Sequence, residues 1–192
     1  LSRFTMDSSM LLSLQRALEQ WLALAAHRTL ERERPFIIGI TGSVGKSSTR
    51  QMVAAVLQTE EARLLVRASA KNYNNELGLP LTIFNCAAPG RSLFLWIDLL
   101  LTAFFTSIGW RKTGVRTFVL EMGADKAGDL AYLTSIAQPD IGIVTGVAPE
   151  DASLPPVHLA KYSSLQALAE EKSTLARQTK SSGTVILNAD DP

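Results

Sequence analysis

The chain has 192 residues, and its 46% hydrophobic content is that of an ordinary globular domain, which argues against disorder. Nineteen basic and eighteen acidic residues give a formal net charge of +1, so no whole-chain field attracts nucleic acid or an anionic membrane. The single cysteine, Cys86, has no second cysteine for a disulfide or a shared metal, which indicates a reducing, cytoplasmic compartment.

The two ends of the sequence suggest an excerpt. The chain begins with Leu1, and no basic segment followed by an apolar run and a cleavage site opens it. It ends at Pro192, just after an apolar strand-like run, where an α/β protein normally continues into another unit. We therefore expect further chain after residue 192.

The first predicted element is an amphipathic helix over residues 11–26, where leucine, alanine and Trp21 recur at helical spacing. The charged stretch 31–34 is expected to close it. After Pro35, the apolar run 36–40 is typical of a strand that is buried on both faces.

Strands and helices alternate along the rest of the chain. The pattern predicts a helix through Leu57, an asparagine-rich loop, an apolar helix from about Leu93, further strands at 64–68, 117–121, 141–145 and 184–187, and helices at 128–137 and 164–177. This alternation predicts an α/β fold with a mostly parallel sheet and helices on both of its faces.

A glycine-containing loop joins the first strand to the next helix. Its glycines allow a tight turn whose N–H groups point at phosphate oxygens, and the helix N-terminus adds partial positive charge. The lysine would reach the β- and γ-phosphates, and the hydroxyl after it would bind Mg²⁺. The residues of this predicted nucleotide-binding loop are Thr41, Gly42, Ser43, Val44, Gly45, Lys46, Ser47 and Ser48.

The loop departs from the strict phosphate-loop consensus, which has glycine where Ile40 stands, so it matches a shorter variant. The alternative is a glycine-rich turn with an incidental lysine. The position of the loop between an apolar strand and a helix favours nucleotide binding.

This loop resembles the ATP loop of the Mur ligase family, which has folylpolyglutamate and cyanophycin synthetases as relatives. The segment 72–82 is similar to the Asn-Asn-x-x-Gly-x-Pro-Leu-Thr signature of the family branch that adds D-alanyl-D-alanine. As an isolated segment it would be interpreted as a polar turn stopped by Gly78 and Pro80. The resemblance implies that Asn75 lies near an acyl phosphate or its metal.

Glu121 ends an apolar strand, where its carboxylate would face the crevice at the carboxyl edge of the sheet. The segment 121–123 resembles the family's Glu-Met-Gly, and a hard oxygen ligand suits Mg²⁺. Asp125 and Asp129 are interpreted as solvated residues at a helix start.

The resemblance also implies a second Mg²⁺ site made by His158 and Lys172. In the family the lysine is carbamylated by CO₂, which turns a cationic amine into an anionic oxygen donor. The family usually has its histidine soon after the proline matched by Pro149, whereas residues 150–157 intervene here. A loop histidine without a ligand role is therefore the alternative for His158.

The last match is Asn188, in a segment similar to the family segment whose asparagine approaches the adenine ring. The alternative is an ordinary strand followed by an Asx turn. The resemblance covers about residues 36–192, and residues 1–35 are interpreted as an N-terminal helix and linker.

The resemblance implies the ATP-binding central domain of an ATP-dependent ligase of peptidoglycan precursor synthesis. Such an enzyme joins D-alanyl-D-alanine to a UDP-N-acetylmuramoyl peptide through an acyl phosphate. Full-length members also have an N-terminal domain for the UDP-linked substrate and a C-terminal domain for the amine, so we expect the chain alone to bind nucleotide but not to ligate. The alternatives are another Mur-type ligase and a non-catalytic nucleotide-binding scaffold module.

The segment 93–110 is apolar enough to be tested as a membrane span, which needs at least about 18 residues. Asp98 argues against a span, and one crossing would separate the phosphate loop from Glu121. We predict a buried or partner-facing helix and no transmembrane span. Shallow membrane contact is the alternative, because Arg91, Arg111 and Lys112 flank an aromatic-rich segment.

Overall fold

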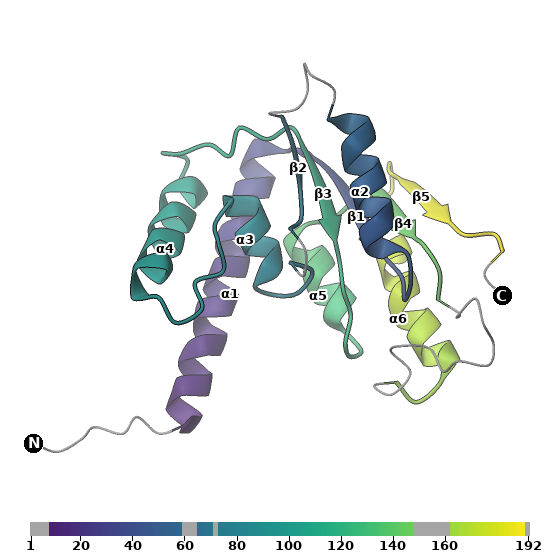
Figure 1. Cartoon of the computed structure of the whole chain (residues 1–192), viewed down its shortest axis with the longest axis horizontal. Helices are drawn as coiled ribbons and strands as arrows, with labels where there is room; N and C mark the ends of the chain where they lie inside the picture. Colours follow the sequence, from purple (N-terminus) through teal and green to yellow (C-terminus); the bar gives the residue numbers. More distant parts are fainter. Residues whose placement is uncertain (1–7, 59–64, 71–72, 148–161, 191–192) are drawn as a thin grey trace, which may run out of the picture.

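Five parallel strands form a single sheet in the order β2-β3-β1-β4-β5 (Figure 1). The computed structural model describes residues 8–58, 65–70, 73–147 and 162–190. The parallel sheet confirms the predicted fold class. The strands are β1 (Phe36–Thr41), β2 (Val66–Ala68), β3 (Thr117–Glu121), β4 (Ile141–Val144) and β5 (Thr184–Leu187).

The central strand β1 lies between β3 and β4. Ile40 is opposite Glu121 on one side of it, and Thr41 is opposite Val144 on the other. Because all strands run in the same direction, their carboxyl ends meet at one edge of the sheet. The loop that follows Thr41 and the residues that follow Glu121 are therefore neighbours, at the edge where α/β proteins bind ligands.

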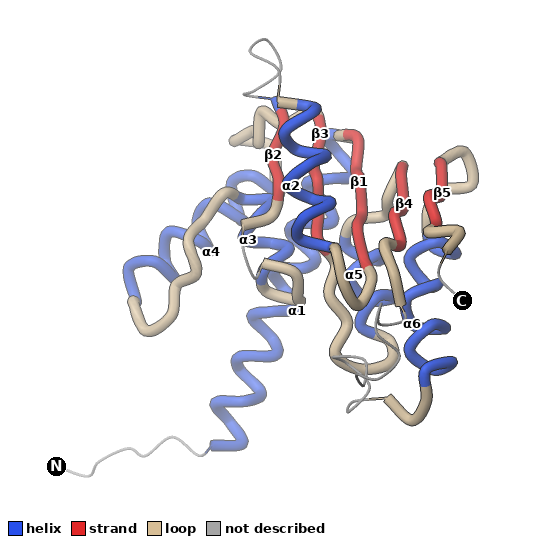
Figure 2. The backbone as a smooth tube through the Cα atoms, turned by 45° about the vertical axis from the view of Figure 1, so that its right-hand side comes forward, coloured by secondary structure: helices blue, strands red, loops and turns tan. Residues whose placement is uncertain are grey.

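Helices cover both faces of the sheet, as predicted. One face carries α2, which packs on Ile38, Ile40 and Val119, and the opposite face carries α1, α3, α5 and α6 (Figure 2). The helices are α1 (Ser8–Glu33), α2 (Lys46–Leu57), α3 (Gly78–Phe84), α4 (Leu93–Ser107), α5 (Asp129–Ile136) and α6 (Leu165–Gln178).

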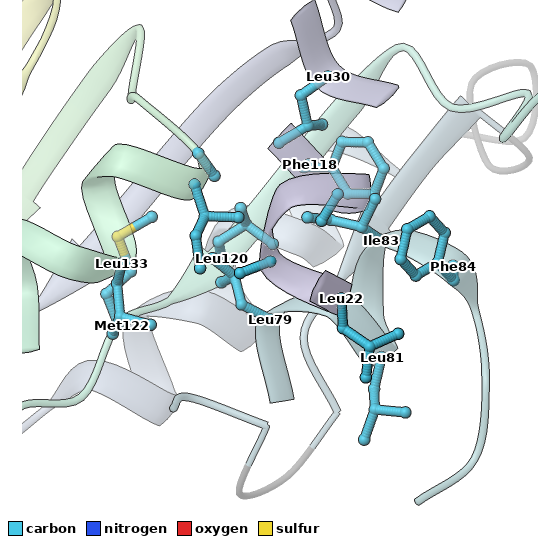
Figure 3. Close-up of a cluster of buried hydrophobic side chains, with 14 of the residues drawn as sticks. Leu22, Leu30, Leu79, Leu81, Ile83, Phe84, Phe118, Leu120, Met122 and Leu133 are labelled. Carbon is cyan, nitrogen blue, oxygen red and sulfur yellow. The ribbon is translucent and has the colours of Figure 1, made fainter. Parts of the chain in front are cut away.

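The main core lies between the sheet and α1, α3 and α5 (Figure 3). Phe118 and Leu120 point into it from β3, whereas Val119 between them points toward α2. This alternation explains why the three consecutive residues 118–120 are all apolar. Leu22 and Leu30 of α1 belong to the same core, so α1 packs on the α/β unit, and the domain boundary at residue 35 stays a prediction.

Helix α3 corrects the prediction of an asparagine-rich loop followed directly by the helix at Leu93. All seven residues of α3 are buried. A Cβ at Gly78 would lie 2.6 Å from the carbonyl carbon of Tyr73, so this approach requires glycine. Pro80 is tolerated because it lies in the first turn, where no N–H is needed. A seven-residue helix that contains both a glycine and a proline shows too little hydrophobic periodicity for the helix to be predicted from the sequence.

Helix α1 is longer than predicted, since the charged stretch forms its last turn. The Arg32 guanidinium donates to the Ser107 carbonyl at 2.6 Å, and the Glu33 carboxylate accepts from Thr113 N at 3.1 Å. Arg34 has a positive φ of 48°, and Pro35 then prevents continuation. Contacts with distant segments therefore set the end of this helix.

The described residues contain no helix that is long and apolar enough to cross a membrane. Helix α4 ends at Ser107, whereas the apolar segment predicted to be helical extends to residue 110.

The core predicts a large cost for Leu120→Ala. Leu120 is fully buried in β3, so truncation leaves a cavity and should lower the free energy of unfolding by about 2–5 kcal/mol. Urea unfolding measures this change. Met52→Ala in α2, where the side chain is 70% exposed, is the control and should stay within about 0.5 kcal/mol. Equal losses in both variants would contradict this core.

Candidate functional site

The loop between β1 and α2 wraps against the end of β4. Gly42 has a φ of 143°, and a side chain there would clash with the Thr145 hydroxyl. That hydroxyl donates to the carbonyls of Thr41 and Val44, at 3.1 and 2.5 Å. Ser43 N donates to the Gly146 carbonyl at 2.6 Å. The loop is therefore shaped by protein contacts at both of its ends.

The N-terminus of α2 has the features of an anion site. Its N-cap, Gly45, makes no side-chain cap hydrogen bond, and the first turn holds no acidic residue. The N–H groups of this turn therefore have no side-chain cap within the helix, as in helix N-termini that bind anions. The Lys46 ammonium donates to the carbonyls of Gly42 and Ser43, at 2.7 and 3.2 Å, so it folds over the loop.

Glu121 connects three segments at the carboxyl edge of the sheet. Its carboxylate is 4% exposed and accepts from Ser47 Oγ at 3.0 Å and from Asn74 Nδ2 at 3.3 Å. Its backbone N–H donates to Ser69 Oγ at 3.1 Å. The structure thus brings together Ser47 and Glu121, both of which were predicted as Mg²⁺ ligands.

Arg50 is a site residue that the sequence reasoning missed. Its guanidinium is buried in α2, where Nε lies 3.4 Å from Glu121 Oε2 and Nη1 donates to the Ser69 carbonyl. Arg50 comes three residues after Ser47, so both side chains lie on the same face of the helix. The sequence did contain a signal for Arg50, namely a charged residue three positions after the serine of the phosphate loop.

Lys172 is buried completely, at 0% exposure, beneath the loop that follows β3. Its ammonium donates to the Ala124 carbonyl at 3.4 Å. Burial, together with the positive charge of Lys46, lowers the pKa of Lys172 to about 8. Burial also lowers the pKa of Lys46. A lysine with its usual pKa is almost wholly protonated near physiological pH, so burial raises the neutral fraction of the Lys172 amine, although the ammonium form still predominates there.

A pocket of about 320 Å³ lies beside the loop. Lys46, Asn75 and Lys172 all line it, so three predicted site residues surround one space. Asn75 also accepts from Gly78 N at 2.9 Å through its side-chain oxygen. The remaining lining residues are Asn74, Glu76, Gly123, Ala124, Asp125, Lys126, Asp129 and Leu133.

Asp129 shapes one wall of this pocket. Its carboxylate accepts from the backbone N–H groups of Asp125 and Lys126, at 2.9 and 3.0 Å. Glu171, next to Lys172, accepts from the N–H groups of Gly128 and Leu130, at 2.9 and 2.8 Å. The two carboxylates hold the turn before α5, and sequence reasoning did not single out Glu171.

Asn188 is not among the residues that line this pocket. Asn188 follows β5, is exposed, and accepts from Asp190 N at 3.2 Å, which is the Asx turn that was the alternative for it. His158 lies outside the described residues. Within the described part of the chain, no three His, Cys, Asp or Glu side chains cluster in a way that would hold a metal by themselves.

The parallel sheet, the loop after its central strand and the carboxylate of the neighbouring strand define an α/β domain of the phosphate-loop class. The sequence also matches the model of the Mur ligase middle domain over residues 40–95 and 101–192. This chain therefore belongs to the Mur ligase family.

Two named relatives are about one third identical to this chain over the aligned residues. A UDP-N-acetylmuramoyl-tripeptide–D-alanyl-D-alanine ligase from Mycobacterium leprae is 36% identical over 156 residues, which are 81% of this chain and 23% of that protein. The enzyme of the same name from Bacillus subtilis is 30% identical, over 81% of this chain and 26% of its own length. The chain thus spans about a quarter of the length of these relatives.

Solved structures share the fold. MurF ligase from Thermotoga maritima in complex with ADP has a TM-score of 0.64 and 24% identity, covering 91% of this chain and 33% of that one. MurF from Acinetobacter baumannii has a TM-score of 0.62 and 23% identity, covering 88% and 30%.

The lowered pKa of Lys172 predicts a pH-dependent stability. Between about pH 8 and 10.5 the unfolded chain holds a proton on Lys172 that the folded chain has lost, so the free energy of unfolding rises with pH. Lys172→Met removes this titration. In CO₂-free buffer the variant should gain up to about 3 kcal/mol over the parent chain at pH 8, and this advantage should shrink toward pH 10.

Urea unfolding at several pH values measures the difference between the two chains. Lys112→Met is the matched control, because it removes an exposed lysine and should give no comparable gain in stability at pH 8. A difference between Lys172→Met and the parent chain that stays constant with pH would contradict the lowered pKa of Lys172.

Proposed function

We propose that this chain is the ATP-binding central domain of a cytoplasmic ligase that joins D-alanyl-D-alanine to a UDP-N-acetylmuramoyl peptide. The observation that carries the proposal is the convergence of Lys46, Asn75 and Lys172 on one pocket beside the Ser47–Glu121 pair. Family membership and the names of the relatives support the choice of substrates.

ATP fits the loop through its triphosphate. The N-terminus of α2, which has no side-chain cap, and the Lys46 ammonium supply positive charge within one short segment. Phosphate oxygens would replace the carbonyls of Gly42 and Ser43 as acceptors for Lys46. The solved ADP complex of the Thermotoga maritima enzyme supports a nucleotide at this fold. Asn188 is proposed to approach the adenine ring.

Mg²⁺ fits the oxygen pair of Ser47 and Glu121, which lie 3.0 Å apart. A Mg²⁺ site commonly has one or two carboxylates and completes its coordination with phosphate oxygens and water. The ion, when bound, would offset negative charge on the nucleotide phosphates. Arg50 would then hold the Glu121 carboxylate in place from the side of α2.

The second ion is proposed to be held by His158 and a carbamylated Lys172. Carbamylation starts from the neutral amine, which attacks CO₂ and releases one of its two protons to give R–NH–COO⁻. The lowered pKa of Lys172 supports this step, because it raises the fraction of side chains that are already in the neutral amine form. Lys172 would then present an oxygen donor in place of a cation, which also removes repulsion from Lys46.

The proposed reaction has two steps. The terminal carboxylate of the UDP-muramoyl peptide attacks the γ-phosphoryl group, which gives an acyl phosphate and ADP, and the amine of D-alanyl-D-alanine then displaces phosphate. Lys46 would offset the charge on the transferring group, which is the main task in phosphoryl transfer. Asn75, in the wall of the pocket, would lie against the acyl phosphate.

The Mg²⁺ assignment predicts a selective defect in Glu121→Gln. The amide keeps the size of the side chain but loses the charge, so the affinity for Mg-ATP should fall about tenfold or more. Binding of ATP in EDTA should change less than about threefold, because the ion is then absent from both chains. Calorimetric titration of the 192-residue chain measures both affinities.

Glu170→Gln is the matched control, since Glu170 is exposed on α6, outside the pocket. It should bind like the parent chain in both buffers. Equal losses with and without Mg²⁺ in Glu121→Gln would show a general structural defect and refute the metal role.

The ligase assignment is tested with the full gene product. ADP release should require both a UDP-N-acetylmuramoyl peptide and D-alanyl-D-alanine, and replacing the dipeptide with glutamate or other amino donors should lower the rate at least about tenfold. A preference for glutamate would identify another Mur-type ligase. ATP binding without ADP release on any UDP-peptide would instead identify a scaffold module.

A further inference from the structure

Helix α4 has a continuous apolar stripe on its solvent side. Five large side chains follow one another at spacings of three and four residues, which places them along one side of the helix. All five are at least 45% exposed, and the first reaches 84%. The stripe, named here the α4 stripe, consists of Phe94, Ile97, Leu101, Phe104 and Ile108.

The inward side of α4 packs against α1 and α3 through Leu99, Ala103, Thr102 and Thr106, and the partly buried Trp96 and Leu100 join the same core. A helix that only covered a core would have a mainly polar outer side. A large apolar surface that packing does not use marks an interaction site.

Basic residues lie at both ends of the stripe. Arg91 precedes the helix, and Arg111 and Lys112 follow it; all three are exposed. Asp98 is the one acidic residue in the segment 91–112. Phe94 lies near one end and Trp110, 80% exposed, lies at the other.

We propose that the α4 stripe docks on an anionic lipid bilayer surface, with α4 lying flat in the interface. Aromatic and aliphatic side chains would enter the boundary of the acyl chains, while the basic residues at the ends would meet lipid phosphates. The helix has 15 residues and none of the described helices can span a membrane, so the contact is with one leaflet.

Charge argues against a second copy of the chain as the occupant. Antiparallel pairing of two α4 helices would bring Arg91 against Arg111 and Lys112, and parallel pairing would bring like residues together. Both arrangements place cations against cations at each end of the helix. An anionic surface is complementary to both ends at once.

The location of α4 leaves the nucleotide pocket accessible. The helix lies at the β2 end of the sheet, and β5 is at the opposite end (Figure 1). The pocket beside Lys46 is lined by residues of other segments. Lipid docking is thus independent of nucleotide binding and of the proposed ligase activity.

Vesicle co-sedimentation of the 192-residue chain tests the proposal. Binding is expected to vesicles of phosphatidylglycerol and phosphatidylcholine, to be much weaker on phosphatidylcholine alone, and to weaken with salt. The triple variant Phe94→Gln, Leu101→Gln, Phe104→Gln should lose binding about tenfold or more. These positions are exposed, and far-UV circular dichroism and the urea midpoint check that the variant folds.

Matched variants distinguish lipid binding by the α4 stripe from nonspecific hydrophobic adsorption. Met52→Gln with Val56→Gln removes two side chains of α2 that are 70% and 76% exposed, and should leave vesicle binding unchanged. Arg91→Gln with Lys112→Gln should weaken binding to anionic vesicles several-fold.

Three outcomes would overturn the proposal. The first is a parent chain that stays in the supernatant with anionic vesicles, and the second is a triple variant that binds like the parent. The third is a lipid-free dimer in light scattering that the triple variant abolishes, which would identify the stripe as a protein interface.

Discussion

The buried carboxylate of Glu121 is the interaction on which the site depends. A negative charge that is 4% exposed is tolerated only where partners replace the lost water. Arg50, Ser47 and Asn74 are those partners, and they come from α2 and from the asparagine loop. One side chain on β3 thus fixes the position of two other segments, including the helix that begins at the phosphate loop.

The buried cations of the site are costly for the same reason. Lys172 lies fully buried near a second lysine, and its lowered pKa records the unfavourable free energy of keeping that charge away from water. A residue selected for stability alone would be apolar at this position. Buried charged groups with strongly shifted pKa values concentrate at functional sites, where they act on a ligand.

Much of the fold followed from patterns that are local in sequence. Alternation of apolar strands with helices predicted all five strands to within a residue or two, and the context of the loop at Gly42 predicted its place at the end of β1. Helix α3 was missed because its burial depends on contacts with α1 and β3, which local periodicity does not encode. The end of α1 was misplaced because Arg32 and Glu33 find their partners some 75 to 80 residues away.

The site was predictable where the residues of a motif are also neighbours in space. Ser47 and Glu121 met as expected because Ser47 follows β1 and Glu121 ends β3, and these two strands lie side by side in a parallel sheet. Arg50 was missed because a buried arginine is identified as a site residue through the carboxylate that it pairs with. That carboxylate, Glu121, belongs to β3 and is distant in sequence. The place of Asn188 near an adenine ring stays a prediction, because its family likeness gives no position relative to the pocket and its side chain is held in a local turn.

The contact between Thr145 and the phosphate loop has a kinetic consequence. The hydroxyl of Thr145 ties the loop to the end of β4 on both sides of Gly42, so contacts within the protein hold the curvature of the cradle. A preformed cradle loses little chain entropy when an anion enters. Capture should therefore proceed at the pace of diffusion and desolvation, with no slow ordering of backbone before the complex forms.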